Sequence, residues 1–161
     1  MEKVKVQIPL FAASLAAMCC VASPVTEKLR GFGRVDAARE TVDLDGHGRV
    51  AVLSFRCETP ENAETVAGKF LYDLYADGAV TFKDGIHETG SGAAFAVGRA
   101  GLTTVIRGAE DRKALEAFLS RNGREALVGK AAVPEWMKAF GWGVYGVGGL
   151  EDYHGWMARA R

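Results

Sequence analysis

Residues 59–78 limit the fold more than any other stretch, because they specify an amphipathic helix with both ends marked. Thr59 offers a side-chain oxygen for an N-cap, and Pro60 occupies the first helical position, where a missing N–H costs nothing. Asp77-Gly78 predicts the end, since glycine adopts the left-handed conformation without a Cβ penalty. Apolar residues recur at three- and four-residue spacing and predict one buried stripe: Ala63, Val66, Ala67, Phe70, Leu71 and Leu74.

Two strand-like runs precede this helix, at residues 41–44 and 49–57. The sequence Asp-Gly-His-Gly at residues 45–48 supplies the positive-φ positions that a tight hairpin needs. The second run is apolar on one face and, at its start, on the other as well. It therefore predicts a strand that is buried on both faces for part of its length. The first face carries Ala51, Leu53, Phe55 and Cys57, and the second begins with Val50 and Val52.

The remainder of the chain predicts shorter elements. Glycine-containing turns separate them, and the second helix has an apolar side made by Leu115, Phe118 and Leu119. In order, we expect a strand at residues 79–82, a turn at 83–85, a loop at 86–92, strands at 93–97 and 102–107, a helix at 110–122, a strand at 126–128 and a short helix from Pro134 to about residue 140.

This order predicts an α+β domain with a βαβ-containing mixed or antiparallel sheet. We expect two helices on one face of the sheet, in a ferredoxin-like or related two-layer sandwich. The predicted organisation is a signal peptide at residues 1–22, a linker or arm at 23–39, the α+β core domain at 40–133 and a Gly/aromatic-rich C-terminal segment at 134–161.

The N-terminus has the three parts of a secretory signal: a basic start, an uncharged apolar run at residues 6–22, and small residues at its end. We expect cleavage after Ala22 and export to a periplasmic, envelope-associated or extracellular location. A retained membrane anchor is the alternative, although the run lies at the lower limit of spanning length. Lipid anchoring at Cys19 or Cys20 is a further alternative, which the bulky Met18 disfavours.

The charge balance argues against nucleic-acid binding, and the cysteine content argues against a disulfide-stabilised fold. Lys+Arg and Asp+Glu number 20 each, so the basic excess expected of a nucleic-acid-binding domain is absent. Cys57 is the one cysteine after the predicted cleavage site, so the mature chain forms no internal disulfide and depends on its apolar core.

The sequence lacks residues that the known metal-binding and cofactor-binding motifs require. A calcium loop starting at Asp43 has His47 at its fifth position and Ser54 where a bidentate Glu is required. A dinucleotide fingerprint starting at Gly90 has Phe95 in place of its third glycine. The histidines are not at metal-ligand spacing. We therefore predict no metal site, no cofactor and no catalytic set.

The C-terminal segment concentrates aromatic residues between glycines, and all three tryptophans fall there. Such rings form a platform for a sugar or a protein partner, or they cover the sheet and contribute by burial. The predicted binding residues are Trp136, Trp142, Tyr145, Asp152, His154 and Trp156.

The function that follows is an exported, non-catalytic binding or accessory module for carbohydrate or an envelope partner. The expected partner is thus an unidentified ligand or protein, with no nucleic acid, and the cleaved chain is not an integral membrane protein. Alternatives are a purely structural subunit, the N-terminal domain of a longer secreted carbohydrate-active enzyme, or a small exported hydrolase. The hydrolase uses Glu151, Asp152 or His154, or pairs Cys57 with His87.

Overall fold

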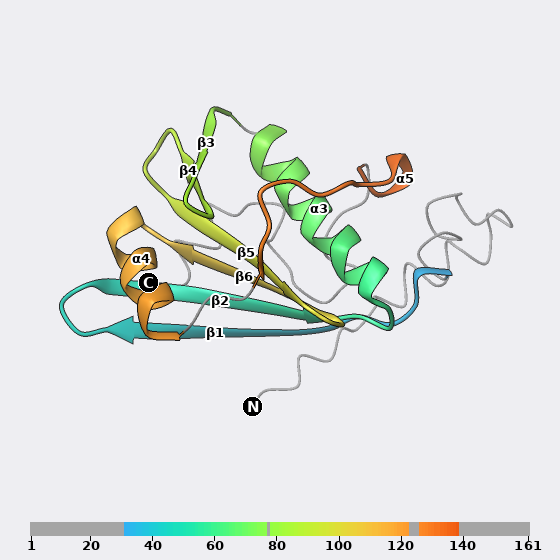
Figure 1. The fold of residues 1–161 in the computed structure, drawn as a ribbon, viewed down its shortest axis with the longest axis horizontal. Helices are drawn as coiled ribbons and strands as arrows, with labels where there is room; N and C mark the ends of the chain where they lie inside the picture. The colour runs from blue at the N-terminus through green and yellow to red at the C-terminus, as the bar shows by residue number, and fades with distance from the viewer. Residues whose placement is uncertain (1–30, 77, 123–125, 139–161) are drawn as a thin grey trace, which may run out of the picture.

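A seven-stranded antiparallel sheet forms the centre of the structure, a computed structural model that describes residues 31–76, 78–122 and 126–138 (Figure 1). The mixed α+β fold with a predominantly antiparallel sheet is therefore confirmed. The elements in chain order are β1 (Asp36–Leu44), β2 (Gly48–Arg56), α3 (Pro60–Ala76), β3 (Val80–Lys83), β4 (Ile86–Thr89), β5 (Ala94–Ala100), β6 (Thr103–Ala109), α4 (Arg112–Asn122), β7 (Ala126–Leu127) and α5 (Glu135–Lys138).

The strand order across the sheet is β1-β2-β6-β5-β4-β3. Strand β5 pairs with β4 near its start and with β7 near its end, so these two short strands share one of its edges. Since every pairing is antiparallel, β2 and β3 run in the same direction and α3 crosses between them over the intervening strands. Likewise α4 connects β6 to β7, which run in the same direction on either side of β5.

The two long helices cover opposite faces of the sheet. Alternate residues of β2 separate into two clusters: Leu53 packs in the cluster that contains α3, and Val52 packs in the cluster that contains α4. We call these clusters the α3-side core and the α4-side core. The prediction of two helices on one face is wrong, because a strand that is apolar on both faces needs a covering layer on each. The ferredoxin-like arrangement is not confirmed.

Helix α3 begins at the predicted cap, and α4 begins at a cap of the same kind. Thr59 Oγ1 accepts a hydrogen bond from the Asn62 backbone N–H at 3.1 Å, and Asp111 Oδ1 accepts one from the Ala114 N–H at 2.9 Å. The six apolar residues of the predicted α3 stripe are all buried. The amphipathic pattern therefore located this helix and its buried face.

Two hairpins follow the predicted turn residues. Leu44 pairs with Gly48 around the first turn, and Asp43 forms an ion pair with Arg49 at 2.7 Å. Asp84 and Gly85 both have positive φ and join β3 to β4, as a two-residue hairpin of this twist requires.

Two differences from the sequence prediction affect the sheet most. Residues 86–89, expected in a loop, form β4, and this strand completes the hairpin that begins at Lys83. Strand β1 begins at Asp36, ahead of the start of the core domain expected at residue 40.

A chain segment that crosses α3 links β7 to α5 (Figure 1). We call residues 128–134 the crossing segment. The Val128 N–H donates to the Val97 carbonyl at 2.7 Å, and a Cβ atom on Gly68 would overlap the Ala132 carbonyl oxygen. Glycine in the middle of α3 therefore permits this close approach. At the end of the crossing, Met137 is fully buried in the α3-side core.

Candidate functional site

Three large hydrophobic side chains are exposed among the described residues: Tyr72 at 41%, Tyr75 at 41% and Phe82 at 48%. Tyr72 and Tyr75 are three residues apart on α3, so they lie on neighbouring positions of the helix surface. Phe82 lies on the edge strand β3. We call these three residues the aromatic surface, and it belongs to the α3 side of the molecule.

His87 joins two members of the aromatic surface. Its ring centroid lies 5.6 Å from that of Tyr75, in an edge-to-face arrangement, and 4.6 Å from that of Phe82. The Phe82 contact follows from the sheet register, because the two residues are direct cross-strand partners. The imidazole has no exposed area. The buried imidazole therefore packs against both exposed aromatic rings from the interior of the protein.

Hydrogen bonds determine the tautomer of this imidazole. His87 Nε2 lies 2.9 Å from the Val128 carbonyl oxygen, which can only accept, so Nε2 carries the proton. His87 Nδ1 lies 2.8 Å from the Tyr75 hydroxyl, and in the neutral ring Nδ1 accepts the hydroxyl proton. One imidazole thus links α3, β4 and the crossing segment.

The pKa shifts favour a positioning role for this pair. Burial lowers the pKa of His87, against the smaller opposing effect of the hydrogen bond to Val128. Burial also raises the pKa of the Tyr75 hydroxyl. Both groups are therefore neutral near pH 7, and Tyr75 is held as a hydrogen-bonded ring.

The crossing segment supports Phe82 from another side. A Cβ atom on Gly129 would lie 2.7 Å from Cε1 of the Phe82 ring, so the glycine backbone packs directly against the ring. Backbone and imidazole together restrict the orientation of a side chain that is nearly half exposed.

Two lysine ammonium groups border Tyr72. The Nζ atoms of Lys138 and Lys69 lie 5.3 Å and 5.9 Å from the centre of the Tyr72 ring. Lys69 Nζ also donates to Asp73 and to the Lys138 carbonyl, each at 2.9 Å, which connects α3 to α5. Trp136 is partly buried against the α3-side core, with its ring 6.0 Å from that of Phe32.

Trp136 is the one predicted binding residue within the described ranges. It serves the covering role that the sequence also allowed, and it lies on the same side of the sheet as Tyr72. The other predicted binding residues lie outside the described residues: Trp142, Tyr145, Asp152, His154 and Trp156.

The structure does not bring Cys57 and His87 together. In the sheet register His87 lies in the same row as Ala51, three strands away from β2, which amounts to roughly 14 Å. Cys57 lies beyond the far end of β2, roughly 20 Å further along the strand direction. Burial also raises the pKa of the Cys57 thiol to about 11, so it remains a protonated core side chain.

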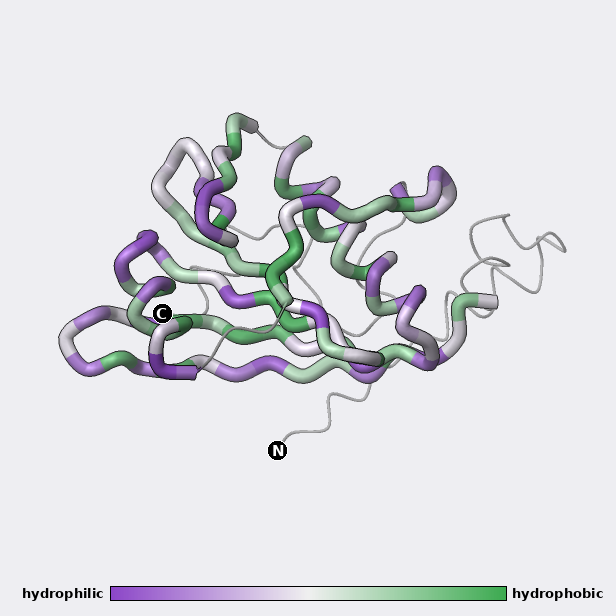
Figure 2. Tube along the Cα trace, in the orientation of Figure 1, coloured by the Kyte–Doolittle hydropathy of each residue, from purple (hydrophilic) through white to green (hydrophobic). Residues whose placement is uncertain are grey.

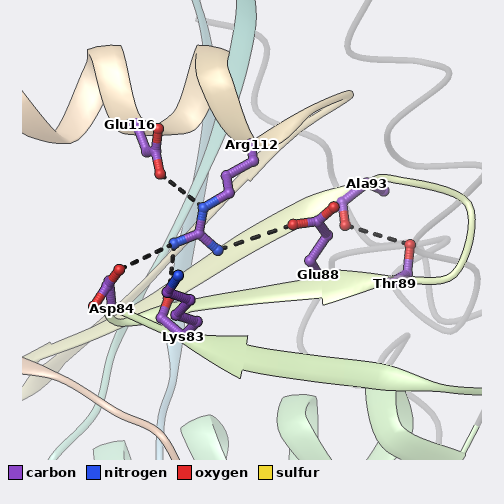
Figure 3. Close-up of polar contacts among 7 residues, drawn as sticks. All are labelled: Lys83, Asp84, Glu88, Thr89, Ala93, Arg112 and Glu116. Atoms are coloured by element: carbon purple, nitrogen blue, oxygen red, sulfur yellow. Dashed lines mark hydrogen bonds and ion pairs between the residues drawn. The ribbon is translucent and has the colours of Figure 1, made fainter.

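A second polar group lies on the α4 side, around Arg112 (Figure 3). Arg112 Nε pairs with Glu116 at 2.7 Å, and Nη2 donates to the Lys83 carbonyl at 3.0 Å. Asp84 and Glu88 lie at 3.8 Å and 3.9 Å from the guanidinium. This arginine joins the start of α4 to the β3–β4 hairpin, and its charge is balanced by carboxylates.

Over the described ranges, no group of three His, Cys, Asp or Glu side chains is placed to hold a metal ion. None of the described helices has the length and apolarity to span a membrane. The comparisons found no protein-family model, no curated protein and no solved structure that matches the chain.

The aromatic surface was not predicted from the sequence. Tyr72 and Tyr75 lie outside the apolar stripe of α3, and this offset was the available signal that both rings face away from the core. Phe82 had no comparable signal, because its strand was too short to define an alternation.

Proposed function

We propose that this chain is an exported, non-catalytic binding or accessory module that binds carbohydrate through the aromatic surface. One observation carries the proposal. Every large hydrophobic side chain that is exposed within the described residues lies on the α3 side, and His87 holds two of the three in place. Exposed rings that are fixed from below suit a ligand with flat apolar faces.

Carbohydrate matches this chemistry on two counts. Sugar rings present apolar C–H faces that stack on aromatic rings, and their hydroxyls bond to groups at the rim. Here the rim offers the Tyr72 hydroxyl and the nearby Lys138 ammonium. Rings whose orientation is already restricted lose little conformational entropy on binding, which increases affinity.

The C-terminal aromatic residues extend the same proposal. Trp136 lies on the α3 side and leads into the segment that carries Trp142, Tyr145 and Trp156. We expect Asp152 and His154 in that segment to bond ligand hydroxyls. Export itself rests on the leader pattern of residues 1–22.

The hydrolase alternative gains no support from the described residues. The Cys57–His87 pair is separated by several strands, and the thiol is protonated. The set of Glu151, Asp152 and His154 lies outside the described residues. An envelope protein remains the other ligand class, and the experiment below distinguishes it.

Titration of the full chain with a panel of soluble glycans, followed by tryptophan fluorescence, tests the proposal. We expect saturable binding to at least one glycan. Tyr72→Ala should weaken it about three- to tenfold, the range expected when one stacked ring is lost. Tyr72→Phe is the matched control, since it keeps the ring and should retain most of the affinity.

Two results would overturn the proposal. A flat response across the whole panel excludes carbohydrate as the ligand and leaves the protein partner. Equal affinities for wild type and Tyr72→Ala would mean that sugar binds elsewhere on the molecule.

A further inference from the structure

Strand β1 forms one edge of the sheet along its whole length. It pairs residue by residue with β2 from Asp36 to Leu44, and no described strand pairs with its other edge. Residues 36–41 are all exposed, so neither helix layer covers this part of the strand. Figure 2 shows that β1 is more hydrophilic than its neighbour β2. Its outer N–H and C=O groups are therefore a template for another strand.

The usual protections of an edge strand are mostly missing from β1. Such edges are normally kept short, or interrupted by proline, a bulge or an exposed lysine. Strand β1 spans nine residues, contains none of Pro, Gly or Lys, and keeps an unbroken register with β2. Charge is the protection that remains, through Asp36, Arg39, Glu40 and Asp43.

The positions of these charges select one partner register. When two copies of a strand pair antiparallel about a two-fold axis, one residue lies opposite itself. Centres at Arg39, Glu40 or Asp43 place like charges opposite each other, which is unfavourable. A centre at Ala38 places Asp36 opposite Glu40.

A centre at Thr41 is complementary instead. It places Arg39 opposite Asp43 of the second copy, and the two-fold axis repeats this pair on the other side of the centre. Thr41 then faces Thr41, and Ala38 faces Leu44 of the second copy. A centre at Val42 also avoids like charges, but it pairs a shorter part of the strand.

The residues required for this register are accessible. Arg39, Thr41 and Asp43 are exposed, and within the described ranges Arg39 makes no ion pair. Asp43 bonds Arg49 through Oδ1, and a carboxylate has further acceptor positions for a second guanidinium.

We propose that β1 is a self-association surface that pairs antiparallel with β1 of a second copy of this chain, with Thr41 opposite Thr41. The two sheets then form one continuous sheet across the interface. Since cross-strand contacts are individually weak, the dimer should form at high protein concentration and weaken with added salt. The inference is independent of the proposed carbohydrate binding.

A site-specific cross-link tests the register. In the full chain with Cys19→Ser and Cys20→Ser, the remaining Cys57 is buried and its thiol has a raised pKa, so it does not interfere. Under mild oxidation, Thr41→Cys should form a disulfide-linked dimer about tenfold faster than Glu40→Cys, because only residue 41 faces its own copy at disulfide distance. Equal rates for the two variants would overturn the register.

Sedimentation equilibrium tests the interface without a cross-link. Wild type should show a concentration-dependent dimer, and Thr41→Arg should be monomeric, because it places two guanidinium groups opposite each other at an exposed position. Circular dichroism confirms that the variant is folded. A wild type that stays monomeric at every concentration, or a Thr41→Arg variant that still dimerises, would overturn the proposal.

Discussion

The two faces of the sheet are built from alternate residues of the same strands, yet they differ in what they expose. The α3 side carries the aromatic surface, the buried His87 and the crossing segment, and residues from both ends of the described chain meet in its core. The α4 side carries one helix over a smaller apolar cluster, and its polar contacts centre on Arg112.

Each face also encloses a cationic side chain, in a different setting. On the α3 side, Lys69 is buried and bonds Asp73 and the Lys138 carbonyl. On the α4 side, Arg107 is buried with its guanidinium 5.8 Å from the centre of the Phe118 ring. The α3 side thus holds the larger apolar core together with the aromatic surface proposed for binding, whereas the contacts of the α4 side join its helix to the sheet.

The largest effect should come from truncating the α3-side core. Phe95 is fully buried, and its ring packs 5.6 Å from that of Phe70, so Phe95→Ala should lower the free energy of unfolding by about 3–5 kcal/mol. Phe118→Ala on the α4 side should cost less, about 1.5–3 kcal/mol, because Phe118 is 6% exposed whereas Phe95 has no exposed area. Urea denaturation measures both, and a larger loss for Phe118→Ala would reverse the comparison.

Substitution of Gly68 should give the next largest change in stability. Whether the change is a gain or a loss tests how the crossing segment packs on α3. Alanine normally stabilises a helix relative to glycine, but here its Cβ would overlap the Ala132 carbonyl. Gly68→Ala should therefore destabilise the domain by about 1–3 kcal/mol. The matched control is Ser120→Ala on the exposed surface of α4, which should change stability by less than about 0.5 kcal/mol. A stabilising Gly68→Ala would show that the crossing segment does not pack on α3.

Acidification should lower the stability of the fold through protonation of His87, on the α3 side. Its folded-state pKa is lowered, so the neutral ring is favoured in the fold and the unfolded chain takes up the proton first. The stability that this group contributes is complete above its ordinary pKa of about 6.5, and it is lost as the pH falls below that value towards the folded-state pKa. The slope for one group is at most about 1.4 kcal/mol per pH unit.

Thermal unfolding between neutral and mildly acidic pH measures this loss. His87→Gln should flatten the pH dependence. His47→Gln, at an exposed turn position, should retain it. If His87→Gln and wild type lose stability in parallel on acidification, another group is responsible.

The smallest effect should come from the ion pairs of the α4 side. Arg112 is partly exposed, and the carboxylates around it are more so, which leaves its pairs screened by water. Arg112→Gln should lower stability by about 0.2–1 kcal/mol at low salt, with a smaller difference at high salt. Chemical denaturation at two ionic strengths is the measurement, and a salt-independent loss would contradict the electrostatic explanation.

Local patterns predicted the elements more reliably than their arrangement. The cap at Thr59, the stripe on α3 and the Asp-Gly turns each depend on neighbouring residues, and the structure confirms them. The layer arrangement was predicted wrongly, although Val50 and Val52 already indicated a second covered face of β2. Strand β4 was missed because His87 and Glu88 are polar, and the burial of His87 depends on partners on other elements of the fold.

The candidate site was predictable only in part for the same reason. Composition singled out Trp136, which packs beside the α3-side core, and its role in binding stays a prediction. The aromatic surface depends on His87, whose contacts join α3, β3 and the crossing segment. These segments are separated in the sequence, so no local sequence pattern predicts that they come together.

The burial of Met137 beside the first described elements has a consequence for biosynthesis. A ribosome delivers Phe32, β2 and α3 long before Met137 and Trp136, which complete their packing. Until then a nascent chain exposes the part of the α3-side core that Met137 and Trp136 cover, and exposed apolar surface of this kind promotes aggregation. Truncation before α5 should therefore yield a chain that aggregates more readily.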